Sequence, residues 1–362
     1  MNLYINETNK SLKLKAYKRM PTESTAVDFS NQLNFMNGWR DIPCDVYHFD
    51  AKVMLSGQAE FNKRFDGTGI LGPNFGVALE PSAFGAKILY SDKNPPWVIE
   101  MCRDYDAIED FVTGLKVPHP MLDGQLPLFY QTFNYMQHLA DGALGAPSGV
   151  IASFDVASLL ISMENLSMLI KLNPDLAHRL IETVNSFLID FIEAKCEYFD
   201  VDNLVIVDLY GDNAGYISAD DFREFVLPYN KKIYDYFGGK DTINLWHCDG
   251  TLGHLMDLIP EMGCNCLYSF DPHTPLSTFV DRIGDRVCLV GNLDPIRLVR
   301  NGTPDEVYAG CLEQLEIGKR AAGFVLSTGG ELTHGTPEAN IDAILRAVKD
   351  HNVLHCLPRG IQ

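Results

Sequence analysis

Short apolar runs alternate with long amphipathic stretches from about residue 150 onward. Each apolar run is rich in valine, isoleucine, leucine or aromatic residues, and each is short enough to be a strand buried on both faces. The predicted strands are 149–153, 204–209, 243–247, 264–270, 287–291 and 324–327. The predicted helices lie between and after them, at 155–170, 174–199, 219–237, 251–261, 304–320 and 337–350. This repeated alternation predicts a parallel sheet with helices packed around it.

The first 120 residues are less regular. Residues 60–80 are rich in glycine, which suits loops, and residues 91–125 form a proline-punctuated connection. We interpret residues 1–125 as an irregular region that holds the first strands of a barrel and a lid-like excursion. The whole chain, 1–362, is then expected to be one (β/α)8 barrel domain, a TIM barrel, with its chemistry at the carboxyl ends of the strands.

Composition narrows the choice of partners. Hydrophobic residues make up 46% of the chain, and 29 lysines and arginines against 48 acidic residues give a net charge of −19. Such a surface repels phosphate backbones and anionic lipids, so we expect neither nucleic-acid nor membrane binding. There is no signal-like or membrane-spanning apolar run, and the nine cysteines contain no CxxC pair. The expected location is the reducing cytoplasm.

Polar side chains gather directly after the predicted strands. This concentration is the strongest physical indication of the site, because barrel enzymes place their chemistry there. The residues are Ser153, Asp208, Asp212, Asn213, His247, Cys248, Asp249, Asp271, His273, Asn292, Asp294, Glu331 and His334.

Three segments carry a resemblance to a known family. They are Phe225-Val226-Leu227-Pro228-Tyr229, Gly291-Asn292-Leu293-Asp294-Pro295 and Ser327-Thr328-Gly329-Gly330-Glu331. In these the chain resembles the uroporphyrinogen decarboxylase superfamily, and the resemblance extends over most of its length. It implies a (β/α)8 barrel and either decarboxylation of a porphyrinogen or zinc-dependent methyl transfer with a corrinoid protein.

The decarboxylase pattern is missing at each position where it can be checked. Gly76 stands where the family's decarboxylases carry an aspartate, Ser153 where they carry a tyrosine, and Gly330 where they carry a histidine. Their arginine-rich segment near the N-terminus has no counterpart here. A strongly acidic chain is also a poor match for a substrate with eight carboxylates.

The methyltransferase pattern is kept in part. Family members that activate a thiol carry His-x-Cys after one strand and another cysteine after the last. Here His247 keeps its place, Asp249 and Gly330 replace the two cysteines, Cys248 is one residue out of register, and Glu331 adjoins Gly330. The resemblance therefore implies zinc on His247, Asp249 and Glu331. Such oxygen-rich donors suit an oxygen-bound methyl donor, a methyl ether, better than a thiol.

The resemblance also suggests what surrounds the metal. We expect Asp212, Asn213, Ser153 and Tyr210 to bind the substrate, and a separate small corrinoid-binding protein to carry the corrinoid. Plainer interpretations remain open. His247 could be a hydrogen-bonded structural histidine, and Asp249 could cap a helix starting near Gly250. The alternative functions are a divergent decarboxylase or lyase, and a non-catalytic binding barrel.

Overall fold

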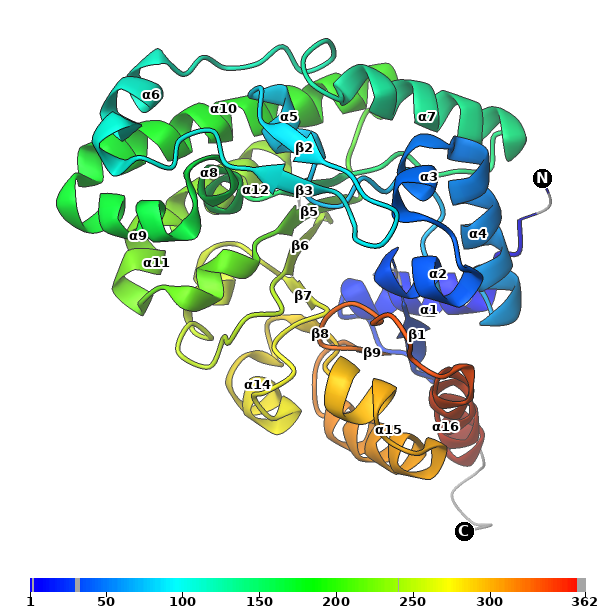
Figure 1. Cartoon of the computed structure of the whole chain (residues 1–362). Coiled ribbons are helices and arrows are strands. Elements are labelled where there is room, and N and C mark those ends of the chain that lie inside the picture. Colours follow the sequence, from blue (N-terminus) through cyan, green and yellow to red (C-terminus); the bar gives the residue numbers. More distant parts are fainter. Residues whose placement is uncertain (2, 30–32, 240, 357–362) are drawn as a thin grey trace.

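A curved sheet of seven parallel strands forms the centre of the molecule. We describe a computed structural model that covers residues 1, 3–29, 33–239 and 241–356. The strand order is β1-β9-β8-β7-β6-β5-β4, and every neighbouring pair is parallel. Figure 1 shows the strands curving around a common centre with helices outside them. The strands are β1 (Ala26–Asp28), β4 (Gly149–Ile151), β5 (Ile206–Tyr210), β6 (Ile243–His247), β7 (Cys266–Tyr268), β8 (Cys288–Val290) and β9 (Phe324–Ser327).

The six strands predicted after residue 149 are confirmed as β4 to β9, and their parallel order confirms the barrel type of fold. Among the described residues the eighth position, between β1 and β4, holds no strand. The segment after α4 (Ala51–Arg64) crosses this gap instead. At one side Phe29 N–H donates to the carbonyl of Thr68 at 2.7 Å, and at the other Ile151 N–H donates to the Glu80 carboxylate at 3.0 Å. A side chain thus supplies β4 with one acceptor that a neighbouring strand would normally offer.

Two buried ionisable side chains, Glu80 and Lys195, lie beside this gap. Both are almost fully buried. Burial raises the pKa of Glu80, while the Ile151 N–H and the charge of Lys195 oppose the shift. Burial lowers the pKa of Lys195 to about 8, and its ammonium donates to the carbonyl of Gly149 at 3.0 Å. Lys195 therefore links α10 (Pro174–Tyr198) to the first residue of β4.

Helices surround the sheet after residue 149, largely as predicted. Asn173 and Thr303 cap α10 and α15 directly before a proline in each first turn, and Thr303 forms a full capping box with Glu306. The helices are α8 (Ser153–Ile161), α9 (Met163–Leu172), α10 (Pro174–Tyr198), α11 (Ala219–Phe225), α12 (Leu227–Phe237), α13 (Leu258–Glu261), α14 (Leu276–Ile283), α15 (Pro304–Gly318) and α16 (Glu338–Cys356), with two short turns, η2 (Asp212–Tyr216) and η3 (Pro295–Arg300).

Three helix predictions need correction. The stretch 219–237 is two helices, α11 and α12, which are separated at Val226. The stretch 155–170 is two helices, α8 and α9, which bend by 107° at Ser162, where φ is 76°. The stretch 251–261 is helical only at Leu258–Glu261, so no helix starts near Gly250. Capping a helix there is thus excluded as the role of Asp249.

The N-terminal region is more helical than its sequence indicated. It contributes one strand, β1, to the barrel, while β2 (Lys87–Leu89) and β3 (Trp97–Ile99) form a separate antiparallel hairpin. Figure 1 shows this hairpin lying over the central strands, with α2, α3 and α4 to one side. The remaining elements are α1 (Glu7–Tyr17), α2 (Leu33–Arg40), α3 (Cys44–Phe49), α4 (Ala51–Arg64), α5 (Leu79–Ala83), η1 (Tyr105–Ala107), α6 (Ile108–Gly114) and α7 (Leu126–Leu139).

The structure also bears on membrane-spanning helices and on the state of the cysteines. Within the described part of the chain no single helix has the length and apolar character to cross a bilayer. The bent pair α8 and α9 meets that test by length and composition alone, and most residues of α8 are buried in the fold. The eight cysteines whose side chains are described are free, and Cys264 and Cys266 are buried core thiols.

Candidate active site

The carboxyl ends of β5 and β6 bring the candidate residues together. In their parallel register Tyr210 pairs with His247, the last residues of the two strands. The chain after β5 enters η2 with Asp212 as its first residue, and the chain after β6 continues to Asp249. Adjacent strands that end at the same level place these side chains side by side.

Asp212, His247 and Asp249 form one compact cluster. Their ligand-type atoms all lie within 4.8 Å of one another. His247 is buried, and its Nδ1 lies 3.0 Å from the carbonyl oxygen of Tyr268. Since a carbonyl only accepts, Nδ1 carries a proton, and Nε2 faces Asp212, whose Oδ1 is 3.4 Å away. The main-chain N–H of Asp249 also donates to Asp212 Oδ1, at 3.1 Å.

The charges in the cluster are unbalanced. Burial and the nearby charge of Asp212 raise the pKa of Asp249 to about 6. Burial on its own would lower the pKa of His247, but Asp212, Asp249 and the carbonyl of Tyr268 together raise it above its usual value. Two carboxylates crowd one imidazole, an arrangement that a cation stabilises.

The residues present fit a divalent metal ion. Catalytic zinc sites commonly have three protein ligands, and a histidine whose second nitrogen is held by a carbonyl is a typical ligand. Gly330 lies against the cluster, because a Cβ atom there would be 3.4 Å from Asp249 Oδ2. Its φ of 149° is rarely adopted by residues with a side chain. The backbone is therefore shaped for glycine at this position, and the ligands that remain are nitrogen and oxygen.

Glu331 lies apart from this cluster. Its two carboxylate oxygens accept from the main-chain N–H of Asn34, at 2.5 Å, and from the Asn34 side-chain amide. Burial raises the pKa of Glu331 to about 7, while the hydrogen bonds from Asn34 and the charge of His247 act in the opposite direction. The carboxyl faces the same end of the barrel as the cluster, since it follows Gly330. The expected role of Glu331 as a metal ligand stays a prediction. In the structure, Asp212 is the residue that joins His247 and Asp249 in the cluster.

The other expected substrate-binding residues make hydrogen bonds inside the protein. Ser153 is fully buried and its hydroxyl donates to Asn185 Oδ1 at 2.7 Å. Tyr210 donates to Asp208 Oδ2 at 2.6 Å, with its ring 5.8 Å from that of His247. Asn213 uses its side-chain amide on Ser158 Oγ at 2.6 Å. Contact of these residues with a substrate remains a prediction.

Two residues near the site were not expected from the sequence. Asn34 holds Glu331 from α2, a helix that sequence patterning did not indicate. Asp155 lies in the first turn of α8 and accepts from the main chain of Asn213 at 2.8 Å. An aspartate in a first helical turn is ordinary, so no sequence signal distinguished it.

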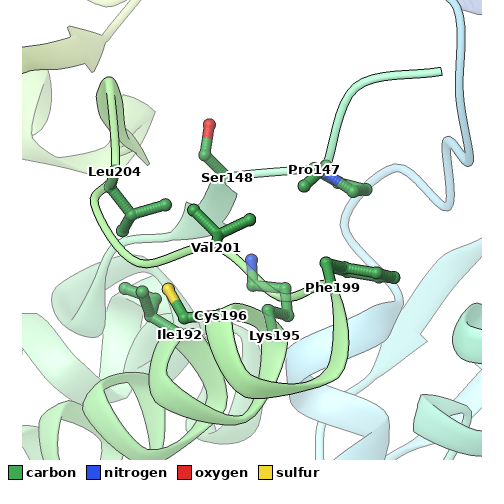
Figure 2. A pocket seen from close by; sticks show the side chains of 9 residues that line it. Pro147, Ser148, Ile192, Lys195, Cys196, Phe199, Val201 and Leu204 are labelled. Carbon is green, nitrogen blue, oxygen red and sulfur yellow. The ribbon is translucent and has the colours of Figure 1, made fainter. Parts of the chain in front are cut away.

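A small pocket lies at the opposite end of the barrel. Its walls come from the segments that precede β4 and β5 and from the end of α10, as Figure 2 shows. The lining is almost wholly apolar apart from the Lys195 ammonium. Because it sits before the strands begin, it is remote from the cluster at their carboxyl ends. The lining residues are Ala146, Pro147, Ser148, Ile192, Lys195, Cys196, Phe199, Val201 and Leu204.

Comparison with known proteins places this site in a family. The family model described as "Uroporphyrinogen decarboxylase (URO-D)" matches residues 40–351. The chain belongs to the uroporphyrinogen decarboxylase family. A methyltransferase from Methanosarcina mazei has a similar fold, with a TM-score of 0.79 at 19% identity over 95% of this chain and 98% of that one.

Curated relatives within the family include both kinds of enzyme. The chain is 27% identical, over 84% of its length and 78% of the relative, to a methylated-thiol–coenzyme M methyltransferase of Methanosarcina mazei. It is 24% identical, over 84% of its length and 86% of the relative, to the methylcobamide:CoM methyltransferase MtbA of Methanosarcina acetivorans. The uroporphyrinogen decarboxylase of Pseudoalteromonas translucida is 28% identical, but over only 49% of each chain. The similarity to these methyltransferases therefore extends over more of the chain.

Proposed function

We propose that this protein is a methyltransferase that takes a methyl group from an oxygen-bound donor and passes it to a corrinoid held by a partner protein. The similarity to methyltransferases over 84% of the chain supports methyl transfer. The observation that carries the proposal further is the cluster of Asp212, His247 and Asp249, which offers one nitrogen and two carboxylates with no thiolate. Asp212 here takes the ligand place first expected for Glu331.

The donor set favours oxygen chemistry. Carboxylate and imidazole ligands leave a zinc ion more Lewis-acidic than thiolates do, and a bound zinc would polarise the ether oxygen of the donor. The reaction breaks the carbon–oxygen bond of the methyl ether. The methyl carbon goes to the nucleophilic cobalt of the partner's corrinoid, and the leaving oxygen keeps the electron pair. An alkoxide or phenolate product then requires a proton.

We infer that Glu331 supplies that proton. With its pKa raised to about 7, it is substantially protonated near neutral pH. Asn34 fixes its direction through two hydrogen bonds to the carboxylate. His247 is held through Nδ1 by the carbonyl of Tyr268 and so keeps Nε2 directed into the cluster. These residues orient the site before the donor enters.

The corrinoid carrier is proposed to be a separate small protein. The similarity to a methylcobamide:CoM methyltransferase over 84% of the chain supports a corrinoid as the second reactant. The carboxyl ends of the strands, where the cluster lies, are the face to which that partner would deliver the cobalt. A porphyrinogen decarboxylase is disfavoured by Gly76 and Gly330, which offer no side chain at two positions that the decarboxylases use.

The direct test is a donor comparison with cob(I)alamin as acceptor. Zinc-loaded protein should form methylcobalamin from an aryl methyl ether such as a methoxybenzoate, measured by its visible spectrum. A methyl thioether and methylated coenzyme M should react at least about ten-fold more slowly, because the site lacks the soft ligands that suit sulfur. Faster transfer from the sulfur donors would overturn the proposal of an oxygen substrate, and no transfer from any donor would overturn methyl transfer.

A further inference from the structure

A buried carboxyl group lies against the turn that carries Asp212, one of the three candidate metal ligands. Asp155, in the first turn of α8, is 5% exposed and so cannot reach a substrate in the barrel mouth. Its Oδ1 accepts from the main-chain N–H of Asn213 at 2.8 Å. One side chain from α8 thus binds the peptide unit that joins Asp212 to Asn213.

The other side of the same turn is fixed by the chain that follows β6. The carbonyl of Asp212 accepts from Cys248 Sγ at 3.6 Å. A Cβ atom at Gly250 would lie only 2.9 Å from that carbonyl oxygen, so the two segments are in close contact. Asp155 on the amide side and the Cys248–Gly250 segment on the carbonyl side therefore hold the peptide units around Asp212.

The residue before Asp212, Gly211, is closely packed and has no room for a side chain. A Cβ atom at Gly211 would lie 2.8 Å from Trp246 Nε1 and 3.3 Å from Asp155 Oδ2. Neither of these two buried polar atoms has a partner among the described residues. The carboxyl of Asp155 is thus pressed against the backbone that leads into the cluster.

Burial of the Asp155 carboxyl group is energetically unfavourable in the metal-free protein. Burial, and next the charge of Asp212, raise the pKa of Asp155 well above its usual value. Burying a carboxyl group with one oxygen unsatisfied costs free energy that an apolar residue would avoid. A buried and partly unsatisfied carboxyl group that is hydrogen-bonded to the peptide between Asp212 and Asn213 points to a role in fixing Asp212.

We propose that Asp155 is a positioning residue that holds the main chain of Asp212 so that its carboxylate faces His247 and Asp249. This inference rests on the proposed metal site, and Asp155 itself does not touch the ion. Because one oxygen of Asp155 accepts the hydrogen bond from Asn213 N–H, the role requires an acceptor and not a negative charge. That distinction makes the proposal testable by conservative replacement.

The experiment uses the full chain with Asp155→Asn, which keeps an oxygen acceptor, and Asp155→Ala, which removes it. Matched controls are Asp221→Asn and Asp221→Ala, since Asp221 is also buried but bonds to Lys171 and Ser218. Zinc affinity is measured by competition with a chromophoric chelator. Amide hydrogen exchange of residues 211–216 is measured on the metal-free proteins by mass spectrometry.

Loss of an outer-shell partner typically weakens metal binding by about 10- to 100-fold. We expect that loss in Asp155→Ala, together with faster exchange confined to residues 211–216. Asp155→Asn should stay within about three-fold of the wild-type affinity, and neither Asp221 variant should change affinity or exchange in this segment. If Asp155→Ala does not fold, the near-isosteric Asp155→Leu takes its place.

The possible outcomes separate this proposal from the proposed function. Unchanged affinity and exchange in Asp155→Ala would overturn the positioning role while leaving the metal site intact. Equal losses of affinity in Asp155→Asn and Asp155→Ala, without faster exchange, would overturn it in favour of a through-space charge effect. A third outcome is that neither the wild type nor any variant binds zinc, while amide hydrogen exchange of residues 211–216 accelerates only in Asp155→Ala. In that case the positioning of Asp212 stands and the proposed metal chemistry fails.

Discussion

Zinc affinity should fall steeply as the pH drops from 7 to 5. Metal binding requires a neutral imidazole and an ionised carboxylate, so protons compete with the ion at both groups. The pKa of Asp249 is raised to about 6, and the pKa of His247 is raised above its usual 6.5. Both groups are therefore protonated, and binding is opposed, below these values. Affinity is fully present only above them.

The size of the effect follows from the two titrations. For a pKa of about 6, the ionised fraction of Asp249 falls about ten-fold between pH 7 and pH 5. For His247, a pKa of only the usual 6.5 already gives a fall of about 25-fold in the neutral fraction, and a higher pKa gives more. Together they predict a loss of roughly 200-fold or more, which corresponds to about 3 kcal/mol of binding free energy.

The assay is a competition titration against a chromophoric chelator calibrated at each pH. His247→Gln removes one of the two titrating groups and serves as the internal comparison. The variant should bind zinc more weakly at pH 7 and should lose less affinity than the wild type on going to pH 5, because only Asp249 then titrates; the pKa of Asp249 rises once the charge of His247 is removed. A wild-type affinity that is flat over this range, or an equally steep slope in the variant, would refute the assignment of these two groups as ligands.

Four further outcomes are expected. Glu80→Ala removes the acceptor of the buried Ile151 N–H in β4, so urea denaturation should show a loss on the order of 2 kcal/mol; a change below about 0.5 kcal/mol would contradict this. If Glu331 supplies the proton as proposed, Glu331→Gln should slow methyl transfer about 100-fold while changing zinc affinity less than about three-fold; a parallel loss of zinc would make it a ligand. Asn34→Ala removes a bond that favours the charged form of Glu331, so the pKa seen in the pH–rate profile should rise, and an unchanged profile would show no coupling. Uroporphyrinogen should not be converted to coproporphyrinogen above a no-enzyme control.

Local patterning was enough to predict most of the barrel. The strands from β4 onward are apolar runs bounded by turn residues, so their positions follow from burial on both faces. β1 has only three residues, Ala26–Asp28, too short for periodicity to be detected. The break between α8 and α9 depends on one residue, Ser162, in a left-handed conformation that the amphipathic pattern does not reveal.

The candidate site was only partly predictable for a different reason. Motif position was enough to single out His247 and Asp249, because both follow a recognisable strand. Whether Asp212 or Glu331 completes the cluster depends on tertiary geometry. The β5–β6 register brings Asp212 to His247, whereas α2 brings Asn34 to Glu331. Contacts between distant segments of this kind leave no local pattern in the sequence.

X-ray absorption at the zinc edge tests the central claim most directly. In protein loaded with one equivalent of zinc, His247 and the carboxylates of Asp212 and Asp249 should give only nitrogen and oxygen neighbours, at about 2.0–2.2 Å. Cys248 lies in the same loop with its Sγ directed to the Asp212 carbonyl, so it is the nearest source of a thiolate. A sulfur neighbour at about 2.3 Å, or protein that retains no zinc, would contradict an oxygen-directed metal site.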